Sequence, residues 1–292
     1  MIVMGLENLG RVGVWSMELR NAGQPGVRDA AAELDDLGWH TIWLPGLDGS
    51  GVLDDVDRLL GAAPHSRVVT GVLNIWGQSP TDLARRVTAL DAEHGPRTVT
   101  GLGIGSPAGA AAHGRPYGDP VTSMRHYLDD LAVPENRRLL GALGPKMVDL
   151  AVARTAGWHP FLVTPDYIAA ARDRVGSAPF LAPHQAVVLD TDPRRARATA
   201  RAGIGMFLGF PTYRANLRRL GFGDDDLVPG GSDRLIDALV AHGTAEDLTR
   251  RVQEHRDAGA DHVAVHVLTD PATPGLPLAA WRELAFLNRH FA

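Results

Sequence analysis

A polar and aromatic triplet, Asn74-Ile75-Trp76, ends an apolar run at residues 68–73 that is typical of a buried strand. Ser79-Pro80 follow as the first residues of a predicted helix, with the serine as its N-cap. Parallel α/β folds bind ligands where their strands end and their helices begin. An amide and an indole at such a point therefore predict a ligand-binding site.

Histidines could supply proton transfer or metal binding to this site. The chain has 12 histidines and no cysteine, but neither HxH nor HExxH spacing occurs. We therefore expect no metal centre and no thiol chemistry. His113 lies in a long predicted loop, residues 105–119, at the ligand-binding edge, and it is a candidate proton carrier. An exposed loop histidine without a catalytic role is the alternative.

Two segments are candidates for phosphate binding. Gly157-Trp158-His159-Pro160 joins a helix to a short strand, and free backbone N–H groups at such a glycine suit phosphate oxygens. Lys146, the single lysine among 29 basic residues, begins a predicted helix at the same edge. Either it pairs with an anionic ligand or it is an ordinary exposed lysine of a first helical turn.

The elements that must position these residues alternate between strand and helix. Eight strands are predicted, at residues 12–15, 41–44, 67–75, 98–104, 138–142, 158–163, 185–189 and 262–267, and one of the intervening helices is predicted at 232–242. This rhythm predicts an α/β fold, a (β/α)8 TIM barrel with insertions, as a single domain over residues 1–292. A doubly wound sheet is the alternative, but residues 101–105 read GxGxG rather than the GxGxxG of a dinucleotide loop.

Bulk composition narrows the class of protein. Of 292 residues, 45% are hydrophobic and 22% are charged, and the formal net charge is −5. A negative charge disfavours nucleic-acid binding, and no apolar run is long enough to span a membrane. No basic segment followed by an apolar core is visible at the N-terminus. We expect a cytoplasmic enzyme that acts on a small molecule, with no nucleic-acid or membrane partner.

Six motifs appear in a fairly specific order: GVLNIW at 71–76, GLGIG at 101–105, MRHYL at 124–128, GPKM at 144–147, HPFLVTP at 159–165 and AGADHV at 258–263. Together they resemble luciferase-like oxidoreductases, and more narrowly the actinobacterial branch that uses the deazaflavin coenzyme F420. The resemblance runs from about residue 13 to the C-terminus. It implies a (β/α)8 barrel with an insertion after the fourth strand, and hydride transfer between F420 and an organic substrate.

The resemblance also implies a site. In such proteins a bulge at the end of the third strand, often with a non-proline cis peptide bond, supports the deazaflavin ring. Here that bond would be Asn74-Ile75 or Ile75-Trp76. Tyr117 or His113 would deliver the proton, and a homodimer is expected. The residues implied to bind the cofactor are Trp15, Leu44, Pro45, Asn74, Ile75, Trp76, Gly105, Ser106, Lys146, Gly157, Trp158, His159 and Pro160. Plain core packing is the alternative for the two tryptophans that would wall the slot.

Two departures from the family pattern keep other functions open. Gly46 stands where relatives often have an acidic residue, and the loop at 113–120 differs from the usual pattern of His, Asp, Tyr and Lys. These changes leave the proton donor unassigned. An FMN-dependent monooxygenase on the same barrel is the second hypothesis, and a non-catalytic relative that has lost cofactor binding is the third.

Overall fold

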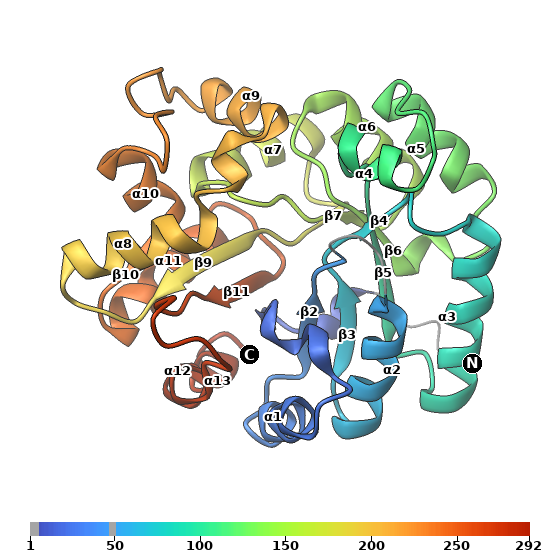
Figure 1. The fold of residues 1–292 in the computed structure, drawn as a ribbon, viewed down its shortest axis with the longest axis horizontal. Helices are drawn as coiled ribbons and strands as arrows, with labels where there is room; N and C mark the ends of the chain where they lie inside the picture. Colours follow the sequence, from blue (N-terminus) through green and yellow to red (C-terminus); the bar gives the residue numbers. More distant parts are fainter. Residues whose placement is uncertain (1–5, 47–50) are drawn as a thin grey trace.

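The computed structural model describes residues 6–46 and 51–292, and its strands form one parallel sheet (Figure 1). The order across this sheet is β10-β9-β11-β1-β2-β3-β5-β6-β7-β8, and β4 pairs with β5. The strands are β1 (Val12–Trp15), β2 (Thr41–Leu44), β3 (Arg67–Thr70), β4 (Leu73–Asn74), β5 (Thr98–Gly103), β6 (Arg138–Leu140), β7 (Gly157–Trp158), β8 (Phe180–Leu181), β9 (His184–Val188), β10 (Val240–His242) and β11 (Val263–Val267).

The sheet closes on itself through the continuous run of β8 and β9. On one side of this run, the Ala182 N–H donates to the carbonyl of Trp158, at 3.1 Å. On its other side, the Ala264 N–H donates to the carbonyl of Pro183, at 2.9 Å. The two ends of the strand order therefore meet, and the fold is the (β/α)8 barrel that the sequence predicts. β10 lies outside the closed ring and pairs with β9 alone among the described strands.

Helices cover the outside of the barrel and place their N-termini at the carboxyl ends of the strands. Five of them begin with a capping residue followed by proline, at residues 79–80, 106–107, 119–120, 164–165 and 192–193, and each capping side chain accepts a backbone N–H. The helices are α1 (Pro25–Asp36), α2 (Val52–Ala62), α3 (Pro80–His94), α4 (Pro107–Ala112), α5 (Pro120–Asp129), α6 (Pro145–Arg154), α7 (Pro165–Val175), α8 (Pro193–Ile204), α9 (Pro211–Arg219), α10 (Asp233–Leu239), α11 (Ala245–Asp257), α12 (Leu278–Leu284) and α13 (Leu287–His290).

Four local predictions were wrong. The strand predicted at 158–163 is only β7, which ends at Trp158, because the chain leaves the extended conformation and Leu162 has a φ of 54°. The strand predicted at 67–75 is two strands, β3 and β4, because the chain turns at Gly71-Val72. The helix predicted at 232–242 ends at Leu239, and Val240–His242 is β10, because the free edge of β9 supplies hydrogen-bond partners. The loop predicted at 105–119 contains α4.

The barrel interior contains aromatic and imidazole side chains beside the branched aliphatic residues usual in such barrels, here Val69, Val99 and Leu139. Trp43 stacks on His159 with ring centroids 4.4 Å apart, and its Nε1 donates to Nε2 of His262 at 2.9 Å. Leu6 and Leu9, from the 3-10 turn η1 (Leu6–Leu9), pack in the same apolar cluster and close the amino-terminal end. Within the described residues, no helix has both the length and the apolar character needed to cross a lipid bilayer.

Candidate active site

The floor of the barrel mouth is a cluster of rings around Trp15. This residue ends β1, is buried, and donates its Nε1–H to the carbonyl of Gly71 at 3.2 Å. Its ring centroid lies 4.3 Å from that of His266, 5.1 Å from His184 and 5.5 Å from Phe161. Trp15 is therefore the packed floor of the mouth rather than one wall of an open slot.

Val72 forms the back of the mouth. Its half-buried side chain lies against glycines of β5 and of the segment after β6. A Cβ on Gly103 would lie 2.5 Å from Val72 Cγ2, and a Cβ on Gly141 would lie 3.1 Å from the same atom. The non-proline cis bond is Gly71-Val72, not Asn74-Ile75 or Ile75-Trp76 as the sequence motifs implied. The difference arises because β3 already ends at Thr70, so the chain turns at Gly71-Val72. The Val72 side chain then fills the space beside Gly103 and Gly141, which have no side chains of their own.

The next residues, Asn74, Ile75 and Trp76, are buried and line the same edge of the sheet. Asn74 Oδ1 accepts the backbone N–H of Trp76 at 3.0 Å, and Trp76 Nε1 donates to the carbonyl of Ile104 at 2.6 Å. The Trp76 ring lies 5.6 Å from the ring of Tyr117. The structure thus brings Tyr117 to the predicted ligand edge.

The other residues predicted near this edge have plain structural contacts. Gly105 has φ of 62°, and a Cβ there would lie 2.8 Å from Asn74 Oδ1, so the position requires glycine. Ser106 caps α4 by accepting the N–H of Gly109 at 3.1 Å. His113 is exposed at the C-terminal end of α4.

The end of β2 explains why an acidic residue is missing. Leu44, Pro45 and Gly46 are all buried. A Cβ on Gly46 would lie 2.3 Å from the carbonyl oxygen of Val72, so the backbone leaves no room for a side chain. Arg20 holds this segment by donating to the carbonyl of Pro45 at 2.9 Å.

The predicted phosphate segment, residues 157–160, belongs to the barrel wall. The N–H of Gly157 donates to Thr155 Oγ1 at 3.3 Å, and the N–H of His159 donates to the carbonyl of Leu140 at 2.8 Å. Trp158 is fully buried in the cluster between barrel and helices, and Pro160 is also buried. Both N–H groups are already bonded, so this segment does not present the donors that the sequence suggested.

Cationic donors gather instead at the start of α6. Gly144 is its N-cap residue, with no side-chain cap, and Lys146 is exposed in its first turn. A Cβ on Gly144 would lie 3.9 Å from Nη2 of Arg219, at the end of α9. Arg219 donates to Asn216 Oδ1 at 3.0 Å, and the buried Nδ2 of Asn216 has no partner among the described residues. A helix N-terminus and two cations are a donor set that fits a phosphate.

Burial keeps the imidazoles inside the barrel neutral. Loss of hydration lowers the pKa of His159 to about 4 and that of His262 and His266 to about 3. The pKa of His184 is also far below its usual value, chiefly through burial. Burial raises the pKa of Tyr117, so its phenol is neutral at pH 7.

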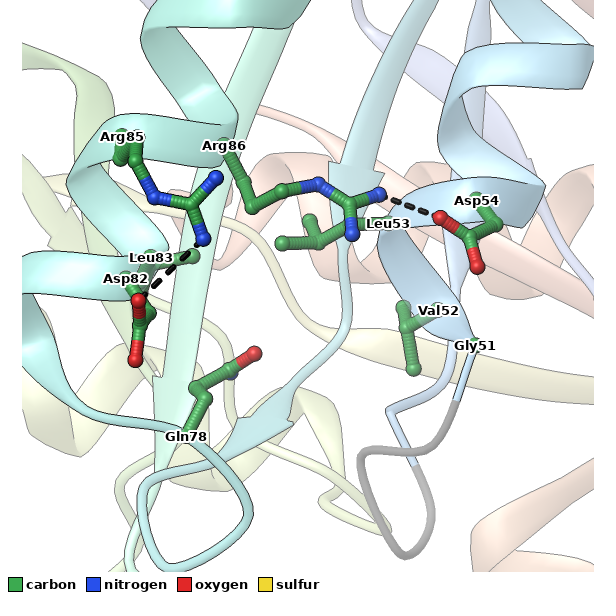
Figure 2. A pocket seen from close by; sticks show the side chains of 9 residues that line it. All are labelled: Gly51, Val52, Leu53, Asp54, Gln78, Asp82, Leu83, Arg85 and Arg86. Carbon is green, nitrogen blue, oxygen red and sulfur yellow. Dashed lines mark hydrogen bonds and ion pairs between the residues drawn. The ribbon is translucent and has the colours of Figure 1, made fainter.

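A pocket of ≈ 170 Å³ lies beside the mouth, between the first turns of α2 and α3 (Figure 2). Its two arginines are paired, Arg85 with Asp82 at 3.2 Å and Arg86 with Asp54. A second pocket of ≈ 130 Å³ lies beside β10 and α11. Both are smaller than the roughly 300 Å³ at which ligand pockets usually begin. Neither lies over Trp15, where Phe161 packs against Phe207 with centroids 5.0 Å apart.

One group of side chains could contact a metal ion. Asp57, Glu93 and His94 place ligand atoms within 4.8 Å of one another on the outer side of α2 and α3. His94 Nε2 is already 2.7 Å from Asp57 Oδ1. This group lies on the outer helices and belongs to no part of the mouth.

Comparison with known proteins identifies the fold. No protein-family model and no curated protein matches the sequence. Solved structures do match over almost their whole length. An F420-dependent tetrahydromethanopterin reductase from Methanopyrus kandleri is 17% identical, with a TM-score of 0.74, over 97% of this chain and 99% of that one. An F420-dependent secondary alcohol dehydrogenase, in complex with an F420–acetone adduct, is 14% identical, with a TM-score of 0.67, over 95% and 97%.

A flavin enzyme has the same fold. The oxygenating constituent of 3,6-diketocamphane monooxygenase from the CAM plasmid of Pseudomonas putida, in complex with FMN, is 15% identical, with a TM-score of 0.62, over 97% of this chain and 98% of that one. At these identities the comparisons confirm the fold that the sequence motifs implied. They include enzymes of both cofactor classes.

Sequence reasoning missed Val72, His184, His266, Asn216 and Arg219. For His266, the spacing along the predicted strand was a signal. His262 and His266 are four residues apart across β11, so both point to the same face of the strand, while Val263 and Val265 point to the other. The two valines are apolar and suit the outer face of the strand, which the helices cover. The two histidines therefore face the inside of the barrel.

Proposed function

We propose that the protein is an F420-dependent oxidoreductase of the luciferase-like type. The observation that carries this proposal is the donor set at the start of α6, on a barrel whose fold is shared with F420-dependent enzymes. F420 has a phosphate between its sugar-like chain and its acidic tail, and Lys146 with Arg219 would bind that phosphate. The apolar back of the mouth at Val72 and the floor at Trp15 fit one face of a planar ring.

The chain would supply binding, orientation and a proton rather than redox chemistry of its own. Bound F420 accepts or donates a hydride at the carbon of its central ring. Val72 and Trp15 exclude water from one face of the mouth because both are apolar and packed. Tyr117 is our preferred proton donor because its ring lies 5.6 Å from that of Trp76 at the ligand edge, whereas His113 is exposed at the end of α4.

FMN is the second candidate cofactor, because its phosphate suits the same donors and a structure with this fold binds FMN. Loss of cofactor binding is supported by Gly46, which excludes an acidic side chain, and by the ring packing over the mouth. A small-molecule substrate, a cytoplasmic location, a homodimer and a single domain stay predictions from the sequence.

Titration of the protein with F420 and with FMN, followed by fluorescence, tests the proposal. Lys146→Glu should raise the dissociation constant of the bound cofactor about tenfold, because a hydrogen bond to a charged group contributes about 1.5 kcal/mol even at the low end. Arg289→Glu makes the same charge change on exposed α13, at the opposite edge of Figure 1 from α6, and should leave the constant unchanged.

The same titration separates the three hypotheses. Tight F420 binding supports our proposal, and comparison with the deazaflavin that lacks the phosphate should show a loss similar to that of Lys146→Glu. Binding of FMN without F420 favours a monooxygenase. If neither cofactor binds and neither raises the melting temperature at saturation, the non-catalytic reading replaces ours.

A further inference from the structure

Two buried histidines at the floor of the mouth are hydrogen-bonded to each other. His184 Nε2 lies 3.0 Å from His266 Nδ1. The rings of Phe161 and Trp15 pack against this pair, with centroids 3.9 Å from His184 and 4.3 Å from His266. His184 begins β9 and His266 is in β11, so the pair joins neighbouring strands of the barrel.

The surroundings of the pair indicate which nitrogens hold protons. Nδ1 of His184 is buried and has no hydrogen-bond partner among the described residues. A buried N–H without a partner is rarer and costlier than a buried lone pair without one. This favours a proton on Nε2 of His184, which would donate to Nδ1 of His266. It follows that the neutral ring of His266 holds its own proton on Nε2.

Nε2 of His266 has no hydrogen-bond partner among the described residues, unlike Nδ1 of the same ring. His266 is 4% exposed, and in the described part of the chain its Nε2 neither makes a hydrogen bond nor belongs to the polar atoms sealed from solvent. His266 lies four residues further along the chain than His262, toward the carboxyl end of the barrel. Trp43, His159 and His262 fill the barrel on the other side, so access to His266 comes from the mouth.

We propose that His266 is a ligand-contacting residue whose Nε2–H donates a hydrogen bond to an acceptor oxygen of the molecule bound in the mouth, and that His184 is the positioning residue that holds this tautomer. The acceptor is a carbonyl or enolate oxygen, on the cofactor ring or on a carbonyl substrate. The identity of the ligand rests on the proposed function, whereas the tautomer rests on the pair alone.

Packing by itself does not explain this pair. Branched aliphatic residues usually fill a TIM barrel, and two imidazoles in their place bring polar nitrogens that must be satisfied. At the other end of the barrel both nitrogens of His262 are satisfied, one by Trp43 and one by the carbonyl of Gly10 at 2.9 Å. His159, at that same end, has a partnerless Nε2 that is sealed from solvent, whereas the partnerless Nε2 of His266 is not among the sealed atoms of the described residues.

Nitrogen-15 NMR of histidine-labelled protein tests the tautomer, with His184→Phe used for assignment. We expect protons on Nε2 of both His184 and His266 in the wild type, and a mixture of tautomers on His266 in the variant. A proton on Nδ1 of His266 in the wild type would overturn the assignment. This measurement needs no cofactor and no substrate.

Ligand binding tests the contact itself. His266→Phe should raise the dissociation constant of F420 or FMN about tenfold, and His266→Gln, which keeps a donor, should raise it much less. His262→Phe removes an imidazole from the closed end of the same barrel and should leave the constant unchanged. If the wild type binds a cofactor and folded His266→Phe binds it equally well, the contact is refuted while the proposed function stands. If the wild type binds neither, the proposed function and the ligand contact both fall.

Discussion

The contact of Val72 with Gly103 predicts that Val72→Ala restores part of the stability lost in Gly103→Ala. Gly103→Ala would place a Cβ 2.5 Å from Val72 Cγ2, about 1 Å closer than carbon atoms normally approach. Overpacking of this kind costs about 1–3 kcal/mol. Val72→Ala removes both Cγ atoms and, since this side chain is half-buried, costs about 1 kcal/mol at roughly 0.8 kcal/mol per buried carbon.

The double variant should therefore be more stable than the sum of the single variants implies. We expect the loss of unfolding free energy in the double variant Val72→Ala/Gly103→Ala to be about 1–2 kcal/mol smaller than the sum of the two single losses. Urea unfolding measures this, as shifts of the midpoint at constant slope. Binding of the cofactor should weaken in both variants with Val72→Ala, because the back of the mouth loses its apolar surface.

Gly101→Ala is the matched control. Its Cβ would lie 2.0 Å from the carbonyl oxygen of Thr70, which is backbone and cannot be removed by truncating Val72. Val72→Ala should rescue Gly103→Ala and fail to rescue Gly101→Ala. Equal rescue of both, or rescue of neither, would refute this account of the back of the mouth.

Two further predictions concern buried carboxylates, Asp35 at the amino-terminal end of the barrel and Asp55 beside the carboxyl end of β2. Burial alone would raise the pKa of Asp35, but hydrogen bonds from Ser66 and His65 outweigh it and lower that pKa below 3.8. The ionised carboxylate therefore stabilises the fold at pH values above 3.8, and this stabilisation is lost as the pH falls below it. The melting temperatures of wild type and Asp35→Asn should converge as the pH falls from 7 to 3. A difference that stays constant over this range would contradict the prediction. Asp55→Ala would leave Arg20 largely buried without its carboxylate, which lies 3.1 Å away, and should cost about 3–5 kcal/mol in urea unfolding. Replacing Arg20 with Met in the same chain should recover part of that loss, and no recovery would show that the charge is not the cause.

The alternation of strands and helices made the barrel predictable, because each element carries its own local signals. Cap and proline pairs such as Thr164-Pro165 mark helix starts without reference to any distant residue. The break of the third strand had no such signal. Val68 and Val72 belong to the same apolar run, and the turn at Gly71-Val72 depends on space left by glycines of other strands.

Side-chain direction was the least predictable property of the site. β7 has only the residues Gly157 and Trp158, so no alternation exists from which to infer which of them faces inward. Trp158 packs outside the barrel, while Trp15 and Trp43 pack inside it. Similarly, the proposed phosphate donors Lys146 and Arg219 come from α6 and α9, whose proximity only the fold shows.

Only one of the 29 basic residues is a lysine, which makes selective chemical labelling beside the mouth possible. Lys146 carries the one side-chain amine of the 292-residue chain, and it is exposed in the first turn of α6. A reagent that acylates amines would thus mark one side chain only, beside the proposed phosphate donors. The extent of that labelling, read on the proteolytic peptide that contains Lys146 so that the N-terminal amine does not contribute, would report occupancy of the proposed phosphate site without an engineered tag and before a substrate is known.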